Sequence, residues 1–204
     1  VRLLGGLVFL LGLVLVIVGG AELFTGSCLI LLSWAVKRVS AVELLRNWAS
    51  VYLGNFIWSE GSSLLVHFSG TLSLGDRVVQ SIAIAITKGT MVLPFLDAFV
   101  RGILCNVLAC FAVWTSFAAL HVAGKVIAIV LPVTAFVTLG FEHLVGNMHY
   151  ILVAMIAGSE KVDIAESIPD LLPVTLGIIV SGVGLVAAVF RMIYLTYLAK
   201  RYSA

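Results

Sequence analysis

The chain has very few charged residues for its length. Only 11% of its 204 residues are Asp, Glu, Lys or Arg, and the formal net charge at pH 7 is +2. Soluble domains of this size keep about a quarter of their residues charged. The charges also form no Lys/Arg-rich tract, so nothing indicates a nucleic-acid partner. The low charge therefore excludes an ordinary water-soluble domain and argues against nucleic-acid binding.

Cysteines and the common catalytic motifs are also scarce. Cys28, Cys105 and Cys110 lie inside apolar runs without CxxC spacing. This placement is typical of small residues in a membrane core rather than of metal ligands or disulfide partners. The sequence has no Gly-rich phosphate loop, HExxH motif, nucleophile elbow or Ser/His/Asp set. We therefore expect no cofactor and no enzymatic function.

Apolar residues, by contrast, dominate the chain. They make up 62% of it, and its mean hydropathy is +1.20. A helix needs about 20 residues to cross a hydrocarbon core of about 30 Å, and five apolar segments are long enough. They cover about residues 3–36, 48–68, 94–119, 126–158 and 171–197. The sequence therefore predicts an all-α integral membrane protein, with residues 1–204 forming a single transmembrane channel domain.

The distribution of charge gives these spans an orientation. One side carries mainly basic residues, namely Lys37, Arg38, Arg46, Lys125, Lys200 and Arg201 against the acid Glu43. The other side carries Asp76, Arg77, Lys88, Glu160, Lys161, Asp163, Glu166 and Asp170. Because basic residues mark the cytoplasmic side, we expect the C-terminus inside and the acidic loop at 159–170 outside.

The two longest apolar segments share an internal pattern. Residues 20–26 and 140–146 both read Gly-x-Glu-x-x-x-Gly, in the middle of spans that run in opposite directions. This arrangement predicts two broken helices in an inverted repeat, an architecture that places a substrate site near the membrane midplane.

The repeat also divides the chain. Residues 1–70 form a first repeat, 71–92 an outer connecting loop and 93–204 a second repeat. The second repeat begins with a full span that has no counterpart in the first. We therefore expect a further helix upstream of Val1, the first helix of the first repeat.

Broken helices favour an anion pathway. Unwound backbone in hydrocarbon leaves polar groups unpaired, so it is tolerated only where protein buries it or where it lines a cavity. The N-terminus of each second half-helix presents a partial positive charge. The breaks therefore predict a channel or transporter for a small monovalent anion.

Ionisable residues at the breaks are the first candidates for function. The imidazole of His143 can donate a hydrogen bond or a proton to a weak-acid anion; the alternative is a buried histidine satisfied by a neighbouring hydroxyl or carbonyl. Glu22 and Glu142 are costly in hydrocarbon and need partners. They either anchor backbone N–H groups at the breaks or shape the electric field along the path.

Several further residues have weaker indications. Leu23, Phe24 and Phe136 lie on or near the breaks and form either a hydrophobic constriction or ordinary packing. Lys88 precedes the third span, where it could attract anions. Asn106 lies deep in that span, where an amide needs an interhelical partner.

These motifs together resemble the formate/nitrite transporter family, which also includes hydrosulfide channels. The resemblance covers essentially the whole chain. It is carried by residues 21–26, Asn47-Trp48 with Gly54-Asn55, residues 101–106 with 112–114, residues 140–143 with 146–148, and residues 173–177.

The resemblance implies an aquaporin-like protomer of three plus three helices and a homopentamer in membrane lipid, with one pore in each protomer. It implies that His143 is the central pore histidine. Leu23, Phe24 and Thr25 would form the loop beside the cytoplasmic constriction, and Phe136 the outer one. Lys88 and Asn106 would be the polar partners of Glu142.

Some positions depart from the family pattern. Ile178 stands where Asn is usual, Trp58 replaces a small residue, and Glu60 places a carboxylate in the second span. His149 and Tyr150 are also unusual after the Asn-Met pair.

We interpret the sequence as a path for formate or nitrite across a prokaryotic inner membrane, with possible protonation at His143. A hydrosulfide channel of the same family is the nearest alternative. A neutral-solute pore of aquaporin type is another, although the paired Asn-Pro-Ala motifs are absent.

Overall fold

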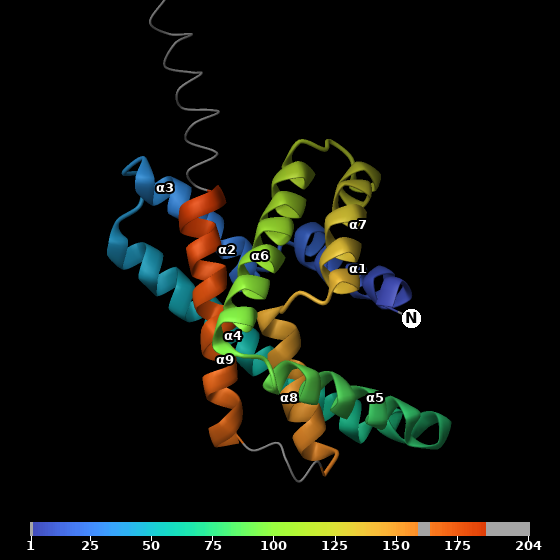
Figure 1. Cartoon of the computed structure of the whole chain (residues 1–204). Helices are drawn as coiled ribbons and strands as arrows, with labels where there is room; N and C mark the ends of the chain where they lie inside the picture. The colour runs from blue at the N-terminus through green and yellow to red at the C-terminus, as the bar shows by residue number, and fades with distance from the viewer. Residues whose placement is uncertain (1, 159–163, 187–204) are drawn as a thin grey trace, which may run out of the picture. The chain divides into compact units, whose positions relative to one another are not determined.

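The computed structural model describes residues 2–158 and 164–186. Within these residues the regular structure is entirely helical (Figure 1), so the predicted all-α fold is confirmed. The chain divides into two compact units, which we describe separately. Of the described residues, the first contains 2–52, Ile103–Phe141 and 178–186, and the second contains Leu53–Gly102, 142–158 and 164–177.

The first apolar segment is a broken helix in the first unit. Its parts are α1 (Arg2–Gly19), α2 (Phe24–Ser27), the 3-10 turn η1 (Cys28–Ile30) and α3 (Leu31–Ala35). The direction of the chain bends by 53° between α1 and the part that starts at Phe24. The break predicted from the glycines around Gly20 is therefore present.

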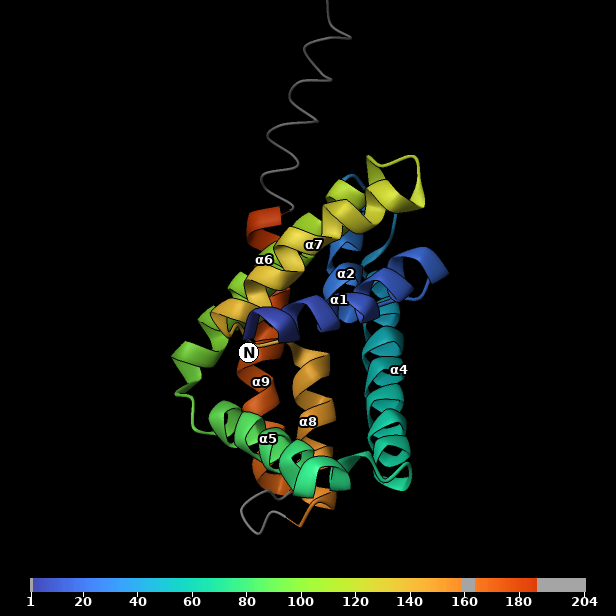
Figure 2. The same ribbon diagram turned by 90° about the vertical axis from the view of Figure 1, so that its right-hand side faces the viewer.

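The helix α1 packs against α7 (Val122–Leu139) in both views of the chain (Figures 1 and 2). The two backbones approach closely at Gly6, where an added Cβ would come within 3.0 Å of the Thr134 Cα. Next to this contact the ring of Phe9 meets that of Phe136 edge-on, with centroids 5.7 Å apart. A small residue and an aromatic pair thus hold the two helices together.

The apolar core of the first unit extends from α7 to α6 (Phe95–Phe117). Its buried members are Leu13, Cys105, Ala112, Ile129, Val133 and Phe136. A smaller cluster forms where α3 meets the start of α4 (Ala41–Phe68), through Leu31 and Leu44.

The second unit is built around α8 (Leu144–Ile156). Its other parts are the later portion of α4, the turn η2 (Thr71–Ser73), α5 (Leu74–Met91), the start of α6, and α9 (Ile164–Val180) as far as Gly177. The helix α5 lies across α8 (Figures 1 and 2). Thr87 ties the two together by donating to the Tyr150 carbonyl at 2.8 Å. At the close contact of α6 with α9, Gly102 faces the Val174 backbone.

The connection at 71–92 was expected as a loop, and the structure forms α5 there. This segment alternates apolar and polar residues at helical spacing, so it lacks the long apolar run by which spans are recognised. Its regular part follows Arg77, because Gly75, Asp76 and Arg77 have positive φ.

By length and composition, α6 and α7 are long and apolar enough to cross a bilayer, and the bent pair of α1 with α2–α3 could form a third span. The helix α4, predicted as a span from about residue 48, has 28 residues but a more polar composition. The described part of the fifth apolar segment lies in α9 and in the π-helix η3 (Ser181–Val186). Part of the acidic loop and the basic tail, with Glu160, Lys161, Asp163, Lys200 and Arg201, lie outside the described residues.

Candidate functional site

The two Gly-x-Glu-x-x-x-Gly segments adopt the same backbone geometry. Gly20 and Gly140 both have left-handed backbone, with φ of 74° and 71°. In each break the residue after the glycine donates its N–H to the carbonyl five residues earlier. These bonds run from Ala21 to Val16 and from Phe141 to Phe136, both at 2.9 Å. A left-handed glycine with this bond is the usual helix stop, and it satisfies carbonyls that hydrocarbon would leave unpaired.

The half-helix after each break starts in the same way but with a different side chain. Leu23 and His143 are the extended residues before the first helical turn, at φ −116° and −105°. His143 Nδ1 accepts a hydrogen bond from the Gly146 N–H at 3.1 Å. With Nδ1 as acceptor, the neutral ring carries its proton on Nε2, which can donate. The second break therefore combines a helix N-terminus with an imidazole donor.

Glu22, the acid of the first break, is held by an amide. Asn47 Nδ2 donates to Glu22 Oε2 at 3.2 Å. The Asn47 Oδ1 atom is buried and has no hydrogen-bond partner within the described part of the chain. Both residues line a cavity of about 350 Å³ in the first unit, together with Leu23 and Phe117. An unpaired acceptor beside a cavity suits a water or a solute that carries a donor.

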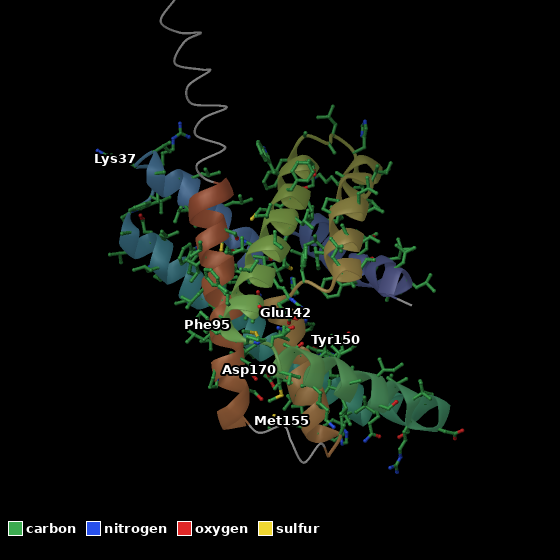
Figure 3. The ribbon with its side chains drawn as sticks, viewed as in Figure 1. Lys37, Phe95, Glu142, Tyr150, Met155 and Asp170 are labelled. Carbon is green, nitrogen blue, oxygen red and sulfur yellow. The ribbon has the colours of Figure 1, made fainter. Side chains whose placement is uncertain are left out.

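Glu142, the acid of the second break, is 7% exposed and lies just before α8 (Figure 3). It accepts from Asn147 Nδ2 at 2.8 Å. The Thr90 hydroxyl and the Arg101 guanidinium also interact with its carboxylate. Lys88, expected as a partner of Glu142, is exposed in the last turn of α5. The groups that the second unit brings to this carboxylate are therefore an amide, a hydroxyl and a guanidinium.

Asn106 is fully buried in the first unit. Its Nδ2 atom donates to the Ile178 carbonyl at 2.9 Å and to the Ser181 hydroxyl at 2.6 Å. An amide in a membrane span needs a partner on another helix. For Asn106 these partners are the Ile178 carbonyl and the Ser181 hydroxyl, at the end of α9 and just after it. The expected link of Asn106 to Glu142 stays a prediction.

Thr25 follows the first break and is 1% exposed. Its hydroxyl is buried and makes no hydrogen bond within residues 2–158 and 164–186. Its neighbour Phe24 is also buried, with edge-on contacts to the rings of Trp48 and Tyr52. An unpaired buried hydroxyl is unfavourable unless something else binds it.

The three predicted constriction residues are all packed in the structure. Phe136 is 1% exposed, and Leu23 packs at the margin of the same apolar core. Phe24 is held by its two aromatic neighbours. Their role as constrictions stays a prediction.

Four polar residues at the breaks had no role predicted from the sequence. They are Asn47, Thr90, Arg101 and Asn147. The available signal was an amide or a charge inside an apolar segment, because such a group needs a partner in lipid. Residues 2–158 and 164–186 contain no group of three His, Cys, Asp or Glu side chains that could hold a metal ion.

The positions that depart from the family pattern have distinct environments. Ile178 is fully buried, and its carbonyl accepts from Asn106. Trp58 is 73% exposed on α4, and Glu60 beside it is half-buried. His149 contacts serines of α4.

Comparison with known proteins agrees with this geometry. The sequence profile described as Formate/nitrite transporter matches residues 1–192. The formate channel FocA of Haemophilus influenzae is 34% identical over 199 residues, covering 89% of this chain and 70% of the relative. A probable formate transporter of Methanothermobacter thermautotrophicus is 35% identical over 212 residues, covering 96% and 76%.

A solved structure described as a pentameric formate channel with formate bound superposes with a TM-score of 0.88. The two sequences are 37% identical, and the match covers 95% of this chain and 83% of the other. A profile match over nearly the whole length, together with relatives that share a third of their residues, establishes that the chain belongs to the formate/nitrite transporter family.

Proposed function

We propose that this chain conducts formate or nitrite across the inner membrane of a prokaryote, with His143 as the group that meets the anion. The chain is a multi-pass membrane protein of a family of channels and transporters. Its relatives include channels named for formate, and its structural neighbour was solved with formate bound. These names support a small carboxylate as the substrate.

The observation that carries the proposal is the hydrogen bond from the Gly146 N–H to His143 Nδ1. It fixes the ring at the start of α8 and leaves the proton of the neutral ring on Nε2. An anion approaching this helix N-terminus finds partial positive charge and a donor together. An imidazolium has protons on both ring nitrogens, so protonation of His143 would break the bond from Gly146. Transfer of that proton to formate would restore the bond and let the anion pass as the neutral acid.

The other predicted site residues have supporting roles in the proposal. Thr25, with its unpaired buried hydroxyl, offers a hydrogen bond to a dehydrated solute. Leu23, Phe24 and Phe136 supply apolar surfaces that disfavour a hydrated ion. Lys88 raises the positive potential where anions enter.

We further propose a homopentamer in membrane lipid, with one pore in each protomer and the C-terminus in the cytoplasm. The pentameric assembly of the structural neighbour and the basic side predicted from the sequence support this arrangement.

The test is flux into liposomes that contain the full chain, measured for formate, nitrite and hydrosulfide. It is run about one unit below and one unit above the ordinary imidazole pKa of about 6.5. We expect formate and nitrite flux, faster at the lower pH. A preference for hydrosulfide would replace the substrate assignment. Flux of neutral solutes alone, insensitive to pH, would indicate a pore of aquaporin type and overturn the proposal.

A further inference from the structure

A second histidine of this unit, on α8, lies in a cluster of serines. His149 Nδ1 is 2.9 Å from the Ser63 hydroxyl and 3.1 Å from the Ser62 hydroxyl, both on α4. Ser59 and Ser63 are buried and His149 is half-buried. Ser59 and Ser63 also donate to the α8 carbonyls of Val145 and His149. The cluster is therefore a polar contact between these two helices in the second unit.

The hydrogen bonds in this cluster favour a proton on Nδ1. The Ser62 and Ser63 hydroxyls lie within bonding distance of three acceptors: the Ser59 carbonyl, the His149 carbonyl and Nδ1. Two hydroxyl protons cannot satisfy all three. If Nδ1 carries a proton, it donates to a serine oxygen, and both hydroxyl protons remain for the carbonyls. This arrangement suits a ring with its proton on Nδ1, either the neutral tautomer or the imidazolium, so the serines can remain hydrogen-bonded when the ring takes up a second proton.

The elements around His149 carry few other ionisable groups. Tyr150 packs its ring edge-on against the imidazole, with centroids 5.6 Å apart. The remaining ionisable side chains on α4, α5 and α8 of this unit are Glu60, His67, Asp76, Arg77 and Lys88. Glu142, with Arg101 near its carboxylate, and His143 directly precede α8. The imidazole is the titratable group that the serines contact.

We propose that His149, Ser62 and Ser63 form a second proton-binding site, and that the charge on His149 tunes the protonation of His143. His143 directly precedes α8 and His149 lies on it six residues later, so the two are roughly 9 Å apart along the helix axis. At this distance a charge in a protein interior is felt strongly. A proton on His149 disfavours a second proton on His143 and attracts an anion. The tuning rests on the function proposed for His143, whereas proton binding at His149 does not.

The proton site is tested by NMR titration of the full chain in lipid nanodiscs, with 15N-labelled histidine. The His149 signal, assigned by its loss in His149→Gln, is expected to titrate between about pH 5 and pH 8. The double variant Ser62→Ala/Ser63→Ala loses the acceptors for Nδ1–H, so its midpoint moves to lower pH by about one unit.

Two matched controls accompany this titration. Ser81→Ala removes a hydroxyl of α5 that donates to its own helix. His67→Gln removes a different histidine, which lies on α4. Both are expected to leave the midpoint of the His149 titration unchanged. A His149 signal that does not titrate, or whose midpoint is the same in Ser62→Ala/Ser63→Ala, overturns the proton site.

The tuning is tested by the pH profile of formate flux in liposomes. His149→Gln removes the neighbouring charge, so the flux midpoint moves to higher pH by about one unit, whereas His67→Gln leaves it in place. An unchanged profile in His149→Gln overturns the tuning. Absence of formate flux in the unmodified chain overturns the proposed function and the tuning with it, while the NMR titration decides the proton site independently.

Discussion

Leu23 and His143 occupy the same position in the two broken helices, directly before the second half-helix, but only the His143 side chain accepts a hydrogen bond from the helix it precedes. The backbone of the two breaks is otherwise alike. The first half-helix therefore starts with an apolar side chain and the second with a titratable cap. This asymmetry gives the cap and proton roles of His143 separate experimental signatures.

Substituting His143 by Asn separates these two roles. Asn is a strong helix cap but does not titrate, so His143→Asn keeps thermal stability and loses the pH dependence of formate flux. His143→Phe loses both, with a cap contribution of about 1 kcal/mol. The two variants are compared by thermal unfolding in one detergent and by formate flux at two pH values. An unchanged pH profile in His143→Asn would remove the proton role.

Gly20→Ala tests the left-handed turn of the first break. No atom lies within 4 Å of an added Cβ at Gly20, but its φ of 74° is strained for a residue with a side chain. We expect a loss of about 1 kcal/mol in the free energy of unfolding, and a smaller loss for Gly20→Asn. Gly12→Ala is the control, because Gly12 also has open space but lies inside α1. Equal stability of both alanine variants would contradict the turn argument.

Local features of the fold could be predicted from the sequence. The end of the helix at Gly140 depends on the backbone freedom of one residue, so the Gly-x-Glu-x-x-x-Gly pattern is enough to predict it. The bond between Glu142 and Asn147 joins neighbours in the chain and could also have been inferred. The electrostatic interaction of Glu142 with Arg101 could not, because it depends on where the start of α6 lies relative to the second break.

The helix α5 could not be predicted for a related reason. Its amphipathic pattern is ordinary for a surface helix, whereas membrane spans are recognised by apolar length. The serines that contact His149 are separated from it by more than 80 residues. Glu60 on α4 and His149 on α8 both depart from the family pattern. That these two residues lie on helices in contact becomes visible only when α4 is seen packed on α8.

Gly102→Ala tests the close approach of α6 and α9. An added Cβ would lie 2.9 Å from the Val174 carbonyl oxygen and 3.1 Å from its Cα. Because both are backbone atoms, the helices must separate, and we expect a loss of about 1 to 3 kcal/mol in unfolding free energy. Gly61→Ala on α4 has nothing within 4 Å and is expected to be neutral or slightly stabilising. Thermal unfolding that fails to distinguish them would show that the helices can adjust.

Ser40 and Glu43 form a reciprocal cap before the second apolar segment. Glu43 Oε2 accepts from the Ser40 N–H and hydroxyl, both at 2.8 Å, and the Ser40 hydroxyl accepts from the Glu43 N–H at 3.2 Å. The bond from the Ser40 backbone, followed by that from its hydroxyl, lowers the pKa of Glu43 from its ordinary 4.5. This stabilisation is therefore complete above pH 4.5 and is lost as the pH falls through the lowered pKa.

An NMR titration of the Ser40 amide reports this cap. Its signal is expected to shift with a midpoint below 4.5, because protonation of Glu43 weakens the bond. Ser40→Ala removes the hydroxyl bond and moves the midpoint toward 4.5, whereas Glu43→Gln abolishes the titration. A Ser40 signal that is insensitive to pH would show that the cap does not form in solution.

Thr25→Val tests whether an unpaired buried hydroxyl is kept for function. The Thr25 hydroxyl is buried without a partner among the described residues, so the nearly isosteric valine is expected to raise the unfolding free energy by about 1 kcal/mol. Formate flux should fall, because the donor to the solute is gone, and Thr25→Ser should retain it.

Thr87→Val is the matched control: its hydroxyl donates to the Ala83 and Tyr150 carbonyls, so the same change should destabilise by about 1 kcal/mol. A variant that gains stability while losing flux marks a residue selected for transport, since a structural role would lower both together. Lower stability with unchanged flux in Thr25→Val would place Thr25 among the packing residues.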